Sequence, residues 1–115
     1  MLVERAVEPK KGYWDVPGGF VDVGENFEES VQREIKEELG IDLENLEYAG
    51  SWIDTYEYQE IIYPTICVMF IAKLKATPDI KPADDVASYK FFKPSELPFE
   101  KFAFAWMEKF FKNYI

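Results

Sequence analysis

Residues 18–41 read GGFVDVGENFEESVQREIKEELGI, and the helix that they predict is the main clue to the fold. The stretch opens with a glycine pair, passes a short apolar run and becomes dense in carboxylates before a closing glycine. Glu34, Glu37 and Glu38 stand three and four residues apart, so at about 100° per residue they share roughly a quarter of the helix circumference. Like charges at that spacing destabilise an isolated helix. The cluster therefore indicates a bound cation, a buried partner or plain solvation.

Both ends of this helix carry local signals. Asn26 is a predicted N-cap, and Glu29 three residues later completes a variant of the capping box. Gly40 is the predicted left-handed stop. The apolar positions recur every four residues and predict a buried stripe of Phe27, Val31, Ile35 and Leu39. The opposite side, which we expect to be solvated, holds Glu29, Gln32 and Lys36.

Composition limits the possible functions. The chain has 115 residues, of which 48% are hydrophobic, so we expect one globular domain. Its net charge is -9, which argues against a nucleic-acid partner because that binding requires Lys and Arg to neutralise phosphates. An acidic protein that handles phosphates needs metal ions to offset the repulsion.

Some chemistries are excluded outright. The sequence has no histidine and a single cysteine, so catalytic Ser-His-Asp and Cys-His groups, histidine metal sites and an internal disulfide are impossible. Cys67 lies in an apolar run and is predicted to be a core residue. The N-terminus has no signal-peptide core, and no run reaches the roughly 18 apolar residues that cross a membrane. We expect a soluble, cytoplasmic protein without membrane contact.

The rest of the chain alternates between extended and turn signals. We predict strands at residues 2–7, 14–16, 20–23, 46–58, 61–74 and 86–93, loops or turns at 8–13, 76–85 and 94–97, and a helix at 99–114. The apolar run 61–74 suggests a strand that is covered on both faces. The core side chains of the last helix are predicted to be Phe102, Trp106, Phe110 and either Phe111 or Tyr114. This order predicts an α+β fold, a mixed sheet sandwiched between helices.

The spacing of the fixed residues from Gly19 to Ile41 is G-x5-E-x7-R-E-U-x-E-E-x-G-U, where U is aliphatic. This pattern resembles the signature of the Nudix (MutT-like) hydrolases, and the lead-in RAVEPKKGYWDVPGGF is also typical of that family. The resemblance implies a single Nudix domain over residues 1–115. It also implies that the domain is short of an N-terminal strand, because only 18 residues precede Gly19.

The resemblance also implies a chemistry. The expected reaction is metal-assisted attack of water on the pyrophosphate of a nucleoside diphosphate that is linked to another group, with Mg²⁺ or Mn²⁺ as the cofactor. Arg33 would orient carboxylates by pairing with Glu37 or Glu25. The implied catalytic residues are Glu25, Arg33, Glu34 and Glu37. The implied metal ligands are the carbonyl of Gly18 and the side chains of Glu34, Glu37, Glu38 and Asp85, with Glu37 acting through a second ion or water.

The general base is open among Glu34, Glu57, Glu60, Asp84 and Asp85. Relatives carry an acidic residue near the start of the strand before the last helix, and Asp85 matches that position best. Three residues later relatives often have another glutamate, where this chain has a serine, Ser88.

The substrate is expected to be a small nucleotide diphosphate derivative. Residues 50–58, GSWIDTYEY, lack the Ser-Gln-Pro-Trp-like stretch of relatives that act on NADH, and a single cysteine cannot form their zinc module. The proline that is associated with ADP-ribose hydrolases is also absent, and a tyrosine there is similar to dinucleoside polyphosphate hydrolases. Side chains that could stack on a base or meet a phosphate are Arg5, Trp14, Phe20, Trp52, Tyr56 and Tyr58.

Two alternatives follow from the same sequence. The domain could be a catalytically silent module that binds nucleotides or regulates a partner. A missing strand would leave a sheet edge open, so the chain could instead form a homodimer through its N-terminal edge or be shortened from a longer parent.

Overall fold

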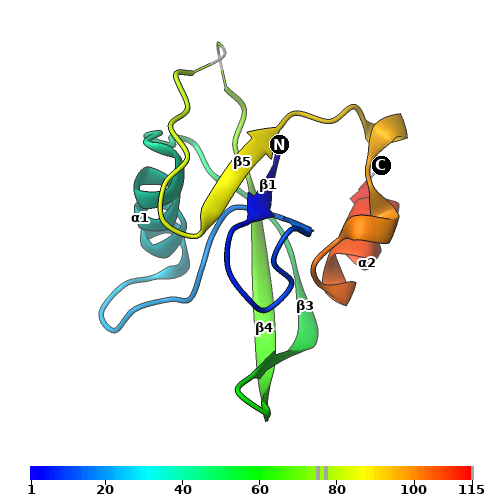
Figure 1. The fold of residues 1–115 in the computed structure, drawn as a ribbon. Coiled ribbons are helices and arrows are strands. Elements are labelled where there is room, and N and C mark those ends of the chain that lie inside the picture. The colour runs from blue at the N-terminus through cyan, green and yellow to red at the C-terminus, as the bar shows by residue number, and fades with distance from the viewer. Residues whose placement is uncertain (75, 77, 115) are drawn as a thin grey trace.

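The computed structural model describes residues 1–74, 76 and 78–114 and contains two helices on opposite sides of a set of strands (Figure 1). The elements in chain order are β1 (Leu2–Arg5), β2 (Trp14–Asp15), α1 (Phe27–Leu39), β3 (Glu47–Tyr58), β4 (Ile61–Ile71), β5 (Val86–Lys90), the 3-10 turns η1 (Pro94–Glu96) and η2 (Phe99–Lys101), and α2 (Ala105–Tyr114). The α+β class predicted from the sequence is confirmed.

The strands form two sheets. One has the order β2-β1-β5, and the other is the long hairpin β3-β4. All of these pairs are antiparallel, and the parallel component in the described residues is an isolated bridge between Trp14 and Phe102. The strand β1 lies between two neighbours, whereas among the described residues β4 is hydrogen bonded only to β3, and a homodimer through an open edge stays a prediction.

Alternation along β1 builds a core on each face of the sheet. Val3 packs with Ile35 and Leu39 of α1. The preceding residue, Leu2, packs with Trp106 and Met107 of α2. Because neighbouring side chains on a strand point to opposite faces, a short central strand joins both helices to the fold.

The helix α1 is bounded as predicted, but its buried face is rotated. The side chain of Asn26 accepts a hydrogen bond from the Glu29 N–H at 2.8 Å, that of Glu29 accepts from the Asn26 N–H at 3.0 Å, and Gly40 has φ 72°. The buried residues are Ser30, Ile35, Glu38 and Leu39. Of the predicted stripe, Phe27 is exposed and Val31 half-buried, because α1 contributes only Ile35 and Leu39 to the hydrophobic core cluster.

Three other predictions need correction. Residues 20–23 form no strand. The strand β4 is not covered on both faces, since Ile62 and Ile66 are exposed. The last helix begins only at Ala105, and its buried face includes Met107 while Tyr114 is exposed. The predicted loop at 76–85 is confirmed except at Thr77, which lies outside the described residues.

No helix in the described residues is both long enough and apolar enough to span a membrane.

Candidate functional site

The glycine pair lies directly against the carboxylates of α1. Gly18 has φ +149°, a conformation that favours glycine, and its N–H donates to Glu38 Oε2 at 3.2 Å. A Cβ atom added at Gly19 would lie 2.5 Å from Cδ of Glu34. Gly18 is therefore required for its backbone conformation, and Gly19 for the space that the Glu34 carboxylate occupies.

Glu38 is a carboxyl group in an environment that disfavours its charge. The residue is 8% exposed. Burial, followed by the negative charges of Glu34, Asp15 and Asp85, raises its pKa to about 8 against the opposing hydrogen bond from Gly18. Within residues 1–74, 76 and 78–114, no basic side chain forms an ion pair with Glu38. A bound cation would supply the missing countercharge.

Arg33 organises the neighbouring carboxylates. It forms a two-bond fork with Glu25, with Nε donating to Oε2 at 3.0 Å and NH2 to Oε1 at 2.7 Å. Its NH1 donates to Glu34 at 2.9 Å and to Glu37 at 3.2 Å. The hydrogen bonds from Arg33 lower the pKa of Glu25 to about 2. The structure thus supports both pairings considered for Arg33, and they hold at the same time.

Glu34 is partly compensated by this arginine but is still shifted. Burial raises its pKa, and the hydrogen bond from Arg33 lowers it by less. The carboxylate lies between the guanidinium of Arg33 and the backbone of Gly19. The ion pair with Arg33 and the close backbone of Gly19 therefore restrict the position of the Glu34 carboxylate.

These groups match the ligand preference of a divalent cation. Mg²⁺ and Mn²⁺ prefer hard oxygen donors, and Mg²⁺ usually binds through one or two carboxylates plus water and substrate phosphates. Glu34 and Glu38 supply such a pair. In the part of the chain that the structure describes, no three Asp, Glu or Cys side chains gather closely enough to form a metal site by themselves. Glu34 and Glu38 therefore fit an ion for which these two side chains supply part of the ligand set.

The other acidic candidates are distributed unevenly. Asp85 directly precedes β5 and is near enough for its charge to raise the pKa of Glu38. Glu37 is exposed and bound to Arg33, and Glu57 and Glu60 are exposed at the far end of the β3-β4 hairpin. Asp84 is also exposed, next to Asp85.

Ser88, where the family pattern often has a glutamate, donates to Glu4 Oε1 at 2.8 Å across the β1-β5 pair. It makes a structural hydrogen bond between two strands.

An aromatic cavity of about 400 Å³ lies between the signature loop and the hairpin. It is lined by Phe20, Tyr56, Tyr58, Tyr63, Pro64 and Thr65. The rings of Phe20 and Tyr56 meet edge to face at 5.4 Å, and those of Tyr56 and Tyr58 stack at 6.4 Å. Phe20, Tyr56 and Tyr58, three of the six side chains predicted to meet the substrate, therefore lie at one place.

Arg5 and Trp14 lie elsewhere. Arg5 donates to Asp15 at 2.9 Å and to the carbonyl of Pro9 at 2.6 Å, so part of its fork is occupied by the protein. Trp14 packs edge to face on Phe92 at 5.2 Å and belongs to the α2 core cluster, as does Trp52. Contact of Arg5 or Trp14 with substrate stays a prediction.

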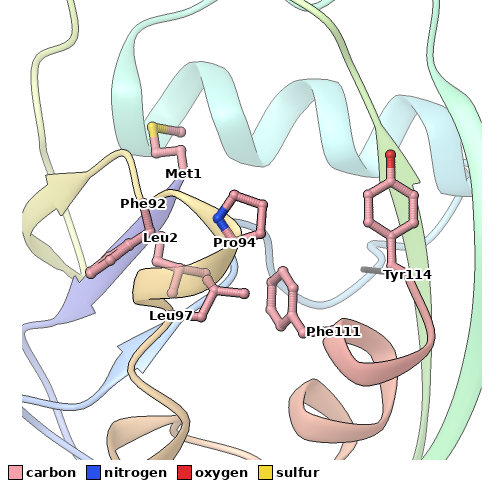
Figure 2. A pocket seen from close by; sticks show the side chains of 7 residues that line it. All are labelled: Met1, Leu2, Phe92, Pro94, Leu97, Phe111 and Tyr114. Carbon is pink, nitrogen blue, oxygen red and sulfur yellow. The ribbon is translucent and has the colours of Figure 1, made fainter.

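A second cavity of about 130 Å³ lies between the start of β1 and α2 (Figure 2). It is lined by Met1, Leu2, Phe92, Pro94, Leu97, Phe111 and Tyr114. The described residues that line it bring no carboxylate and no basic side chain to it.

Sequence reasoning missed two residues of the site. Asp15 is held by Arg5 and adds negative charge near Glu38, while burial raises its own pKa. Its place just before the glycine turn was the available signal. Tyr63 completes the aromatic cavity because it pairs with Tyr56 across the hairpin, and only the register of β3 and β4 places it there.

Comparison with known proteins supports the resemblance seen in the sequence. The model of the NUDIX domain family matches residues 1–114. An ADP-ribose pyrophosphatase of Methanocaldococcus jannaschii is 35% identical over 117 residues, covering 100% of this chain and 64% of that protein. An NAD-capped RNA hydrolase, NudC, of Vibrio vulnificus is 37% identical over 100 residues, covering 85% of this chain and 35% of that protein.

A solved structure of a MutT NUDIX hydrolase from Burkholderia pseudomallei is also similar. It is 27% identical, with a TM-score of 0.70, and the match covers 84% of this chain and 74% of that one. The chain spans less than two thirds of the length of the M. jannaschii and V. vulnificus relatives. The match of the family model over nearly every residue, together with the site geometry, shows that the chain belongs to the Nudix family.

Proposed function

We propose that residues 1–115 act as one Nudix hydrolase domain that cleaves the pyrophosphate bond of a nucleoside diphosphate derivative with Mg²⁺ or Mn²⁺. The observation that carries this proposal is Glu38, a buried carboxyl group without a basic partner in the described residues, placed beside Glu34 and Gly18. A purely structural helix would not be expected to keep such a group, because an uncompensated buried charge is costly.

The residues then take distinct roles. Glu34 and Glu38 would hold the ion, and the family resemblance implies the Gly18 carbonyl and Glu37 or Asp85 as the further ligands. When bound, such an ion would supply Lewis-acid chemistry, neutralising charge on the pyrophosphate and lowering the pKa of the attacking water. Arg33 positions Glu34. Its Nε and NH2 donate to Glu25, and this arrangement holds NH1 against the Glu34 carboxylate.

The aromatic cavity supports a nucleotide substrate. Phe20 lines it and follows Gly19, whose backbone lies against Glu34, so a phosphate near the carboxylates leaves the base within reach of Tyr56 and Tyr58. Aromatic stacking suits any nucleobase. The two relatives named above are an ADP-ribose pyrophosphatase and an NAD-capped RNA hydrolase, so we propose substrates with a nucleoside diphosphate core, ADP-ribose first.

The test is a hydrolysis assay with Mg²⁺ against ADP-ribose, NADH and dinucleoside polyphosphates. We expect nucleoside monophosphate release that EDTA abolishes and that Glu38→Gln lowers by on the order of 10²-fold or more, since a metal ion contributes several kcal/mol to such reactions. Glu28→Gln, an exposed glutamate on the same helix, is the matched control. Nucleotide binding without turnover in the wild-type protein would contradict the hydrolase and favour a silent binding module.

A further inference from the structure

Two lysines from distant parts of the chain lie against the same tyrosine ring. Lys10 and Tyr13 belong to the loop that joins β1 to β2, dark blue in Figure 1, and Lys101 ends the turn η2. The Nζ atom of Lys10 lies 5.2 Å from the centroid of the Tyr13 ring, and that of Lys101 lies 4.8 Å from it. The two ammonium groups are therefore at most about 10 Å apart, roughly one Debye length at 0.1 M salt. We call Lys10, Tyr13 and Lys101 the basic patch.

The charge of the basic patch is not compensated by ion pairs in the described part of the chain. The protein has 22 Asp and Glu residues against 13 Lys and Arg. Even so, neither Lys10 nor Lys101 forms an ion pair within residues 1–74, 76 and 78–114, although Glu8 and Glu100 are close to them in sequence. Both lysines are exposed, and their contacts with the ring hold them near one another. Two neighbouring positive charges of this kind attract an anion.

Backbone hydrogen bonds hold the basic patch in one arrangement. The N–H of Arg5 donates to the carbonyl of Tyr13 at 3.0 Å, and the N–H of Tyr13 donates to the carbonyl of Lys10 at 3.0 Å. The N–H of Ala103 donates to the carbonyl of Trp14 at 2.8 Å, which joins the segment after η2 to β2. Lys10 has φ 64°, a conformation that is uncommon for a lysine and that these hydrogen bonds maintain.

The basic patch is close to the carboxylate site. Tyr13 stands two residues before Asp15 and five before Gly18, so its Cα atom is at most about 7 Å from the first and about 18 Å from the second. The charge of Asp15 in turn reaches Glu38. No residue of the patch lines the aromatic cavity. A substrate with its base in that cavity and its pyrophosphate at the carboxylates therefore leaves the patch to its remaining group.

We propose that the basic patch binds a phosphate that the substrate carries beyond the pyrophosphate that is cleaved. The inference rests on the proposed function and adds a substrate class to it: nucleoside diphosphate derivatives whose second group bears a further phosphate. That phosphate is a monoester on a terminal sugar or a continuation of the phosphate chain, and both sources offer the same charged oxygens to an ammonium group. A phosphate shared by Lys10 and Lys101 offsets the repulsion between them.

The kinetic test uses two matched pairs of substrates. One is ADP-ribose with and without a phosphate on its terminal ribose, and the other is diadenosine tetraphosphate against diadenosine diphosphate. We expect the wild-type protein to prefer the more phosphorylated member of at least one pair by about 10-fold in kcat/KM, mainly through KM, because the contact is remote from the reacting atoms. The pair that shows the preference identifies the source of the phosphate.

Variants connect this preference to the basic patch. The double variant Lys10→Gln/Lys101→Gln should reduce the preference to about 2-fold or less, since both ammonium groups are lost. Lys109→Gln, at an exposed lysine of α2, is the matched control and should leave the preference unchanged. No preference in either pair, or a preference that the double variant keeps, would overturn the proposal.

A binding test without turnover separates this inference from the proposed hydrolysis. Inorganic pyrophosphate is titrated into the metal-free protein in EDTA while the NMR signals of the Tyr13 ring, assigned with Tyr13→Phe, are followed. We expect a saturable shift that Lys10→Gln/Lys101→Gln abolishes and Lys109→Gln keeps. A shift that does not saturate, or that persists in the double variant, would overturn the patch even if ADP-ribose is hydrolysed. Saturable binding in a protein that hydrolyses nothing would support the patch and contradict the proposed function.

Discussion

The position of Glu38 on α1 determines the chemical properties of its carboxyl group. The residue lies on the buried face of α1 with Ile35 and Leu39, so its carboxyl group loses water when the helix packs. The N–H of Gly18 offsets part of that loss, and three other carboxylates oppose it. The same burial that makes the ionised group costly in the free protein makes it a strong ligand for a cation.

This environment predicts how stability depends on pH without metal. The pKa of Glu38 is about 8 when folded, against 4.5 for an unperturbed glutamate, so between these pH values the folded state binds more protons. Its contribution to stability is fully present below about pH 4.5 and is lost as the pH rises through 8. In EDTA, Glu38→Gln should raise the free energy of unfolding at pH 8.5 by on the order of 1 kcal/mol, allowing for solvent screening, and leave it unchanged near pH 4.5.

Urea unfolding at the two pH values measures this difference, with Glu28→Gln as the control. An equal effect of Glu38→Gln at both pH values would contradict the account, because a packing change carries no such pH dependence.

Gly19 gives a second prediction at the scale of one residue. A methyl group there would enter the space of the Glu34 carboxylate, so Gly19→Ala should lower kcat by on the order of 10-fold or more and destabilise the fold by about 1 kcal/mol. A double-mutant cycle with Glu34→Ala measures the coupling by urea unfolding. We expect Gly19→Ala to cost much less stability when Glu34 is already truncated; an additive result would show that the contact is not responsible.

At the scale of the element, the helix α1 has some features that depend on neighbours in sequence and others that depend on distant strands. Its capping box and its left-handed end were predicted because each involves neighbours in sequence. Its buried face was predicted only in part, because burial depends on Val3 and Val86 from distant strands. The apolar stripe could not predict that the buried face of α1 includes Glu38, because such a pattern assigns every carboxylate to the surface.

Residues 20–23 illustrate the opposite failure. They have the composition of a strand, but the carbonyl of Phe20 accepts from Arg33 and the N–H of Asp22 donates to Glu25. Backbone groups satisfied by side chains do not need a ladder. Hydrogen bonds from the side chains of Arg33 and Glu25 therefore take the place of strand pairing here. Both residues belong to the signature motif.

The cap itself is testable. Asn26→Ala removes the acceptor for the Glu29 N–H and should lower the free energy of unfolding by about 1 kcal/mol. Asn113→Ala, an exposed position near the end of α2, is the matched control and should stay within about 0.5 kcal/mol of wild type. Equal losses in the two variants, measured by urea unfolding, would count against a stabilising cap.

At the scale of the whole molecule, the order of the strands was the part least accessible to prediction. The sequence pattern located the five strands of the described residues but could not show that β1 lies between β2 and β5, or that among these strands β4 pairs with β3 alone. Pairing over more than 80 residues, as between Glu4 and Ser88, depends on the assembled core. The same limit applies to the site: Glu34 and Glu38 were predicted from a local motif, whereas Asp15 and Tyr63 joined them through sheet register.

We propose that Glu34 and Glu38 together hold a divalent cation. Titration of Mn²⁺ into the metal-free protein, followed by electron paramagnetic resonance of the free ion, measures that binding without relying on turnover. We expect saturable binding that Glu38→Gln weakens at least about 10-fold and Glu28→Gln leaves unchanged. Equal Mn²⁺ affinity in wild type and Glu38→Gln, with both proteins folded, would contradict the account.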